Sequence, residues 1–149
     1  MQIAIGSDHA GFKMKEDVKK WLLDEGYQVK DFGTDSEDSV DYPDFAEKTA
    51  KNVAEGDSDL GILICGTGIG MAISANKVKG IRAARCHDSY SARMARAHNN
   101  SNILTFGSRV IGIELAKDIV KTYLTTEYSG GRHQRRVGKI DNIEKEMTE

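Results

Sequence analysis

The sequence of 149 residues has little proline, little cysteine and almost no charge imbalance: one proline, two cysteines and a net charge of −2. Two cysteines, Cys65 and Cys86, are too few for a disulfide framework, so we expect free thiols in a reducing compartment, the cytoplasm. The balanced charge predicts no general attraction to nucleic acid or to an anionic membrane. We find no apolar run of membrane-spanning length and no signal peptide, because Asp8 and His9 soon follow the short apolar start.

Short β-rich runs alternate with segments of helical apolar spacing along most of the chain. The expected strands are Gln2–Ile5, Gln28–Phe32, Leu60–Cys65, Ile81–Cys86 and Ile103–Phe106. The expected helices are Phe12–Glu25, Phe45–Glu55, Ile69–Lys77, Ser89–Ala97 and Ile111–Leu124. This alternation predicts right-handed βαβ units, and hence an α/β fold with a parallel sheet covered on both faces.

The alternation ends after Leu124. Residues 128–131 read as a turn, and residues 132–147 as a charged terminal helix with a thin apolar stripe of Val137, Ile140 and Ile143. So thin a stripe predicts that this helix packs on another surface, such as a partner subunit. The length of the chain suits a single domain over residues 1–149.

A glycine-rich segment, Cys65 to Gly70, follows the most apolar expected strand and opens a helix. Such a turn leaves backbone N–H groups free to bind a phosphate, a carboxylate or a developing oxyanion. The spacing does not fit a dinucleotide fingerprint, and no Lys-Ser/Thr pair follows to make a Walker A loop. The alternative interpretation is a tight turn for close helix–sheet packing, which we consider weaker because a cysteine precedes the glycines.

Cys65 has two interpretations of equal weight on local sequence alone. A thiol at the carboxyl end of a parallel strand, beside a helix N-terminus, lies where ligands bind in open α/β sheets and where thiolate is favoured. A lone cysteine is otherwise a small buried apolar residue. No glycine turn follows Cys86, so we assign it to the core.

Three further polar segments could take part in chemistry. Asp8 and His9 end the first strand, at the same sheet edge as Cys65, although Asp8 could also serve as a helix N-cap. His98 lies at the carboxyl end of a predicted helix, where a capping or dipole-compensating role is the better interpretation on local sequence. Arg132 and Arg136 are four apart on a helix and can converge on one phosphate, although a solvated basic face is the usual arrangement.

Together these segments resemble the family of ribose-5-phosphate isomerase B and the galactose- and allose-6-phosphate isomerases, over nearly the whole chain. The motifs that carry the resemblance lie at residues 6–12, 41–43, 61–70, 97–99, 106–109 and 130–136. The resemblance implies a Rossmann-like three-layer α/β/α sandwich with a five-stranded parallel sheet and an extra C-terminal helix. It also implies a homodimer, sometimes a dimer of dimers, with active sites built from both subunits.

The resemblance further implies interconversion of ribose 5-phosphate and ribulose 5-phosphate through an enediolate, without metal or cofactor. Cys65 is then the base, His98 opens the furanose ring, and Thr67 assists proton movement between oxygens. The implied sugar, anion and phosphate contacts are Asp8, His9, Tyr42, Gly66, Gly68, Ile69, Gly70, Asn99, Arg109, Arg132 and Arg136. Some members use a glutamate a few residues after the cysteine position, but residues 72–75 contain no acid here.

Two alternative functions remain open at this point. The same chemistry could act on a six-carbon sugar phosphate. A nucleotide-binding regulatory module of flavodoxin-like type could use the glycine-rich segment for phosphate and leave Cys65 and His98 without a chemical role.

Overall fold

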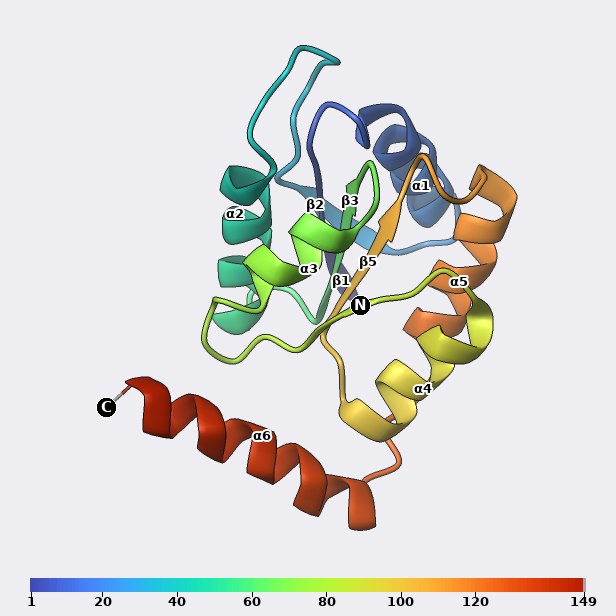
Figure 1. Cartoon of the computed structure of the whole chain (residues 1–149). Coiled ribbons are helices and arrows are strands. Elements are labelled where there is room, and N and C mark those ends of the chain that lie inside the picture. The colour runs from blue at the N-terminus through green and yellow to red at the C-terminus, as the bar shows by residue number, and fades with distance from the viewer. Residues whose placement is uncertain (149) are drawn as a thin grey trace.

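Five parallel strands form one sheet in the order β2-β1-β3-β5-β4 (Figure 1). The computed structural model of the chain describes residues 1–148. The strands are β1 (Gln2–Ser7), β2 (Gln28–Asp31), β3 (Leu60–Cys65), β4 (Ala83–Arg85) and β5 (Ile103–Gly107). In the register of the sheet Ile5 is paired with Ile62, and Cys65 with Gly107. The predicted five-stranded parallel sheet is confirmed.

Helices cover both faces of this sheet, with α2 and α3 on one side and α1, α4 and α5 on the other (Figure 1). The helices are α1 (Phe12–Asp24), α2 (Tyr42–Ala54), α3 (Ile69–Ala75), α4 (Ser89–Asn99), α5 (Ile113–Thr125) and α6 (Arg132–Thr148). Side chains of β3 alternate between two buried clusters, so that Ile62 and Ile64 pack toward α1 and α5. Leu63 and Cys65 belong to the cluster beneath α2 and α3. The three-layer prediction is confirmed as well.

Most element boundaries lie within one to three residues of the predicted ones, and two of the differences have a clear physical reason. Helix α2 begins at Tyr42 rather than at residue 45, because Pro43 lies in its first turn, where a missing N–H costs nothing. Strand β4 is shorter than predicted because, where it begins, side chains rather than a neighbouring strand bond its backbone groups. The Asn76 amide bonds both the N–H and the C=O of Ala83, and Asn102 accepts from the N–H of Arg82.

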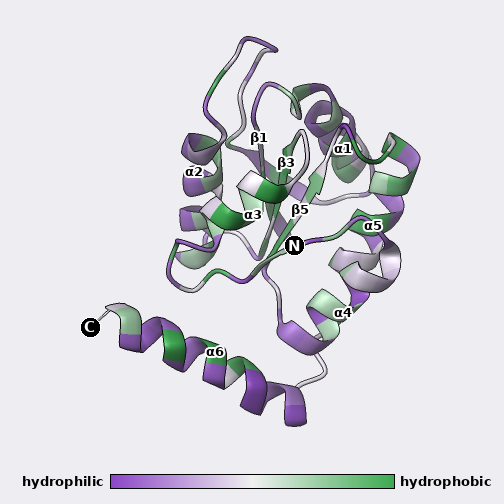
Figure 2. Cartoon of the chain, viewed as in Figure 1, coloured by the Kyte–Doolittle hydropathy of each residue, from purple (hydrophilic) through white to green (hydrophobic). Residues whose placement is uncertain are grey.

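Helix α6 extends away from the sheet beyond the carboxyl end of α4 (Figure 1) and is polar along most of its surface (Figure 2). Val137 is its only buried residue, whereas Ile140 and Ile143 are 46% and 62% exposed. Two polar contacts join α6 to the β4 entry: Arg82 pairs with Asp141 at 3.6 Å, and the N–H of Gly80 donates to Glu144 at 3.1 Å. Among residues 1–148, no helix has the length and apolar character needed to cross a membrane.

Candidate active site

The order of the strands creates a crevice between the carboxyl ends of β1 and β3. The connections from these neighbouring strands leave toward opposite faces, which is the position where open α/β sheets bind ligands. A cavity of about 470 Å³ lies there. It is lined by Asp8, His9, Ala10, Tyr42, Cys65, Gly66, Thr67, Ile69, Gly70, Ile73 and Arg109.

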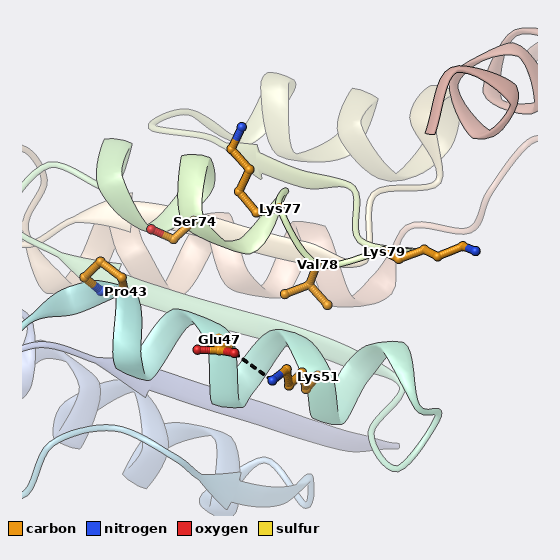
Figure 3. Close-up of a pocket in the computed structure, with 7 residues that line it drawn as sticks. All are labelled: Pro43, Glu47, Lys51, Ser74, Lys77, Val78 and Lys79. Carbon is orange, nitrogen blue, oxygen red and sulfur yellow. Dashed lines mark hydrogen bonds and ion pairs between the residues drawn. The ribbon is translucent and has the colours of Figure 1, made fainter. Parts of the chain in front are cut away.

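A second cavity, of about 450 Å³, lies between α2 and α3 (Figure 3). Three of its lining residues are lysines, but they do not converge on a common point. Lys51 is paired with Glu47 at 2.6 Å, and the amino groups of Lys77 and Lys79 point away from the cavity in Figure 3. This cavity therefore offers no focused set of polar groups, and the crevice beside β1 and β3 is the candidate site.

The residues Cys65–Gly70, here called the glycine turn, form one wall of the crevice, and two of its glycines are required sterically. Gly68 has a φ of +77°, and a Cβ there would lie 2.8 Å from the backbone of Phe106. A Cβ on Gly70 would lie 2.6 Å from the ring of Tyr42. Glycine is needed at both positions because the backbone approaches other groups too closely for a side chain.

The first four carbonyl groups of the glycine turn, at residues 65–68, accept hydrogen bonds from the side of β4 and β5. Their donors are the N–H of Ser108 at 2.9 Å, the N–H of Arg109 at 3.1 Å, Nε of Arg85 at 2.7 Å and Oγ1 of Thr105 at 2.8 Å. With its carbonyls held there, the turn leaves the N–H groups of Gly66, Thr67 and Gly70 without an acceptor among residues 1–148. The turn therefore has backbone N–H groups available for an anion, and the anion site itself stays a prediction.

Cys65 is 5% exposed and lines the crevice. The N–H of Gly68 donates to its Sγ at 3.1 Å, and a negative sulfur accepts such a bond more strongly than a neutral one does. Cys86 belongs instead to the core on the other face of the sheet. Burial raises the pKa of Cys86 to about 11, so it stays a thiol. Of the two cysteines, only Cys65 is placed for chemistry.

Asp8 and His9 approach the crevice from the end of β1. Asp8 is 6% exposed and accepts from the N–H of Gly11 at 3.1 Å. Gly11, and not Asp8, is the residue that precedes α1, so the alternative N-cap interpretation of Asp8 is wrong. Nδ1 of His9 accepts from the N–H of Val40 at 3.1 Å, so the neutral ring carries its proton on Nε2 and can donate from there.

Arg109 and Thr67 complete this group of side chains. The Arg109 guanidinium lies over Gly66, where a Cβ would be 3.1 Å from Nη1. Oγ1 of Thr67 accepts from the N–H of Ile69 at 3.3 Å. A cation, a hydroxyl, an acid, an imidazole and a thiol thus surround one cavity beside free backbone N–H groups.

Four predicted site residues lie elsewhere in the same chain: His98, Asn99, Arg132 and Arg136, here called the helical half-site. None of them lines the crevice. Helix α4 begins beyond the carboxyl end of β4 and runs back along the sheet (Figure 1). Strand β5 begins shortly after α4 ends, so His98 lies toward the amino ends of the strands, whereas Cys65 lies at the carboxyl end of β3. Asn100, with a φ of +46°, ends α4, and so His98 is not the cap residue.

His133 is a member of this second group that sequence reasoning missed. Its ring stacks on that of His98 with centroids 4.1 Å apart and an interplanar angle of 10°. Loss of solvent lowers the pKa of His133, and the charges of His98, Arg132 and Arg136 lower it further. Its position between the two expected phosphate-binding arginines is the one signal in the sequence that could have identified it.

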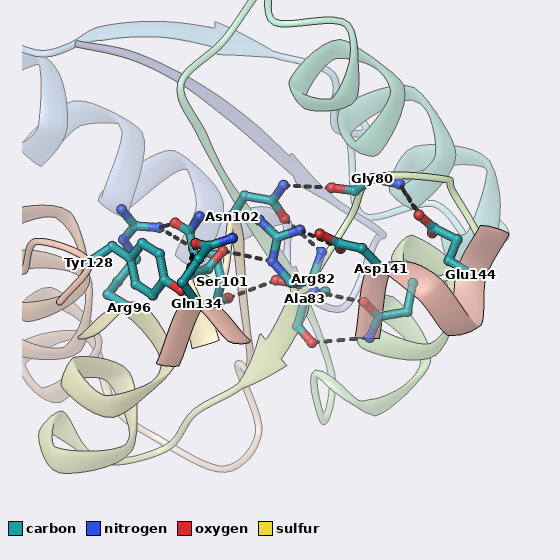
Figure 4. A network of polar contacts seen from close by, with 12 residues as sticks. Gly80, Arg82, Ala83, Arg96, Ser101, Asn102, Tyr128, Gln134, Asp141 and Glu144 are labelled. Atoms are coloured by element: carbon teal, nitrogen blue, oxygen red, sulfur yellow. Dashed lines mark hydrogen bonds and ion pairs between the residues drawn. The ribbon is translucent and has the colours of Figure 1, made fainter. Parts of the chain in front are cut away.

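A network of polar contacts holds the end of α4 and α6 together (Figure 4). Nε of Arg82 donates to the carbonyl of Asn100 at 3.0 Å, while its guanidinium pairs with Asp141 of α6. Nη1 of Arg96 donates to the carbonyl of Ser101 and to the side chain of Asn100. Polar contacts thus join the two helices of the helical half-site at a place separate from the crevice.

The fold and the crevice are typical of enzymes of the open α/β class that bind small anionic molecules. A model of the ribose/galactose isomerase family matches residues 3–140. Ribose-5-phosphate isomerase B of Escherichia coli is 52% identical over 143 residues, which are 96% of each chain. D-erythrulose-4-phosphate isomerase of Pectobacterium atrosepticum is 46% identical over 145 residues, 97% of this chain and 95% of that protein.

The same relationship holds in three dimensions. The structure of ribose-5-phosphate isomerase B from Clostridium thermocellum superimposes with a TM-score of 0.97 at 56% sequence identity, covering 99% of each chain. The chain belongs to the ribose/galactose isomerase family. The resemblance inferred from the sequence motifs is confirmed.

Proposed function

We propose that the protein interconverts D-ribose 5-phosphate and D-ribulose 5-phosphate, with Cys65 as the base. The observation that carries this proposal is the crevice at β1 and β3. There the cysteine thiol lies beside backbone N–H groups that have no acceptor among residues 1–148, in a chain of the isomerase family. A thiol in this position is suited to the transfer of a proton between neighbouring carbons.

The chemistry balances without any further reactant. The Cys65 thiolate takes the proton from C2 of the open-chain aldose, the C1–C2 double bond forms, and the carbonyl electrons move to O1. The free N–H groups of the glycine turn stabilise that enediolate oxygen, an interaction commonly worth about 3–4 kcal/mol per donor. A proton passes from O2 to O1 with the help of Thr67, and the thiol returns its proton to C1 to give the ketose.

Ring opening and phosphate binding, in this proposal, require a second copy of the chain. The helical half-site cannot serve its own crevice, because it lies toward the other end of the strands. Exposed apolar residues beside the crevice and on α6 suit an interface: Ile69 is 48%, Ile73 58%, Ile140 46% and Ile143 62% exposed. We propose a homodimer, or a dimer of dimers, in which each crevice receives His98, Asn99, Arg132 and Arg136 from the other subunit.

Mixed dimers test this shared site. Cys65→Ala and His98→Asn homodimers should both be nearly inactive on ribose 5-phosphate. A heterodimer of the two variants has one crevice with Cys65 from one chain and His98 from the other, so coexpression should restore about a quarter of wild-type activity. A mixture of separately purified homodimers is the control. No recovery in the heterodimer would show that each chain uses its own His98.

A four-carbon substrate is a second candidate, because the relative from Pectobacterium atrosepticum is named for D-erythrulose 4-phosphate. Coupled assays with ribose 5-phosphate, erythrulose 4-phosphate and allose 6-phosphate decide between the substrates. We expect the highest kcat/KM for ribose 5-phosphate. A higher value for erythrulose 4-phosphate would overturn the substrate while leaving the reaction type in place.

Metal independence is part of the same proposal, as is a cytoplasmic location, which the two free thiols support. Within residues 1–148, no three His, Cys, Asp or Glu side chains gather as metal ligands. Activity should survive exhaustive chelation. Loss with EDTA and recovery with a divalent cation would contradict it.

A further inference from the structure

One peptide group of the glycine turn is bonded at both of its ends. The carbonyl of Thr67 accepts from Nε of Arg85 at 2.7 Å. The N–H of the same peptide, which belongs to Gly68, donates to Sγ of Cys65 at 3.1 Å. A guanidinium and the catalytic sulfur therefore lie at opposite ends of one peptide dipole.

Hydrogen bonds in series strengthen one another, because each polarises the group between them. A cation on a peptide carbonyl draws electron density toward oxygen and makes the N–H at the other end a better donor. A thiolate accepts such a bond more strongly than a thiol does. We propose that Arg85 is a positioning residue that stabilises the Cys65 thiolate through the Thr67–Gly68 peptide. The inference rests on the proposed function only for the role of Cys65 as base.

The peptide is held so that this effect reaches the sulfur. The carbonyl of Gly68 is fixed by Oγ1 of Thr105 at 2.8 Å, a bond buried in the core. Gly107 packs directly against Thr67, since a Cβ on Gly107 would lie 2.6 Å from the Cα of Thr67. The N–H of Gly107 in turn donates to Nε2 of His87 at 2.9 Å. These contacts fix Thr67 on one side of the peptide and the Gly68 carbonyl on the other, which keeps the peptide aligned between Arg85 and Cys65.

The charge of Arg85 is available for this role. No carboxylate among residues 1–148 lies within ion-pair distance of its guanidinium. Arg85 does not line the crevice, so its effect on chemistry passes through the peptide rather than through contact with a ligand. The competing interpretation is an exposed cation that bonds a turn carbonyl and does nothing for the thiol.

The test measures the thiolate directly and needs no sugar. The rate of Cys65 alkylation by iodoacetamide is followed against pH, with mass spectrometry of the Cys65 peptide separating it from buried Cys86. In Arg85→Met the midpoint of this profile should move up by about half to one pH unit, less than for direct contact with a charge because the cation is exposed. Arg85→Lys should retain most of the wild-type midpoint.

Two further variants separate charge from hydrogen bonding and from fold. Arg85→Gln keeps a donor without the charge, and its midpoint should fall between those of Arg85→Lys and Arg85→Met. Arg93→Met removes an equal charge from exposed Arg93 on α4 and should leave the midpoint unchanged. Far-ultraviolet circular dichroism checks that each variant is folded. If Arg85→Met is unfolded, the test is made with Arg85→Gln instead.

Kinetics supply the second readout. In Arg85→Met, kcat should fall roughly three- to tenfold at neutral pH with KM nearly unchanged, and the acidic limb of kcat should move with the alkylation midpoint. An unmoved midpoint in Arg85→Met and Arg85→Gln, with isomerase activity intact, overturns the inference and leaves the function in place. A rise in KM alone makes Arg85 a binding residue and also overturns it. A shifted midpoint in a protein that isomerises no sugar phosphate supports the inference and refutes the function.

Discussion

The crevice at β1 and β3 and the helical half-site differ in the part of the chain that provides their polar groups. The crevice relies on the backbone: two glycines admit close approach, and four carbonyls are bonded from behind so that the N–H groups stay free. The helical half-site relies on side chains carried by α4 and α6. Substitutions in the first region should disturb geometry and proton transfer, whereas those in the second should remove single interactions and leave the fold intact.

The largest expected effect is that of Cys65→Ala. Loss of the proposed base should lower isomerisation by roughly 10³-fold, within the usual range for general base catalysis. Exchange of the C2 proton with D₂O, followed by NMR, should cease as well. Cys86→Ala is the matched control and should retain activity. Continued exchange in Cys65→Ala would move the base elsewhere, with Asp8 the first candidate.

Gly68→Ala should break the backbone geometry of the crevice. An alanine at this position must keep the φ of +77°, and its methyl carbon would lie 2.8 Å from the backbone of Phe106. Left-handed strain and overpacking together should cost roughly 2–5 kcal/mol of unfolding free energy, measured by urea denaturation. Gly56→Ala has a similar φ of +83° with no atom within 4 Å, and should cost about 1–2 kcal/mol. Equal losses would show that contact with Phe106 adds nothing.

His98→Asn should damage one direction of the reaction more than the other. Turnover of cyclic ribose 5-phosphate should fall by about 10²-fold, because ring opening loses its acid–base group. Ribulose 5-phosphate cannot close a furanose, so initial rates from the ketose should fall far less. Equal losses in both directions would assign His98 to proton transfer or to binding instead.

Arg132→Ala and Arg136→Ala should weaken substrate binding with little effect on folding. Each charge-assisted contact to phosphate is typically worth about 1.5–3 kcal/mol, seen here as a higher KM. Arg135→Ala is the control, because Arg135 is exposed on the same helix but at a different angle around it. If KM stays at the wild-type value in both variants, these arginines form only a solvated basic face.

The smallest expected effect is on the pH dependence of stability. Burial, and then the charge of Arg85, lower the pKa of His87 from the ordinary value of 6.5. As pH falls below that value the unfolded chain takes up a proton that the folded chain resists, so stability decreases with falling pH. In His87→Gln, the glutamine can still accept from the N–H of Gly107 but does not titrate. The midpoint of denaturant unfolding should therefore fall less between about pH 7 and 5 than it does in the wild type. His133, with a lowered pKa in the other region, contributes in the same direction and remains in that variant.

The sequence predicts the crevice better than the helical half-site, for physical reasons. A strand buried on both faces reads as a continuous apolar run, and β3 has the predicted bounds of Leu60–Cys65. Glycines beside a cysteine also constrain the backbone locally, so the turn at residues 65–70 could be inferred from neighbours in the chain.

Contacts between distant residues carry no such signal. The stacking of His98 on His133 joins positions on two different helices, and the bond from Arg85 to Thr67 crosses from β4 to the end of β3. Pattern and propensity describe one segment at a time, so neither pairing follows from them. The predicted roles of the residues came from the motif resemblance. Only the structure shows that the crevice and the helical half-site lie toward opposite ends of the strands.

Helix α6 buries only Val137 of its 17 residues, and Gly138 follows that residue directly. A glycine inside a helix costs roughly 1 kcal/mol, and one buried side chain cannot offset the ordering of so many residues. In a lone chain, α6 should therefore open often without unfolding of the sheet, and its amides should exchange with solvent hydrogen rapidly. If the chains assemble as proposed, this protection should rise with protein concentration, because the segment carrying Arg132 and Arg136 would then become ordered at the interface.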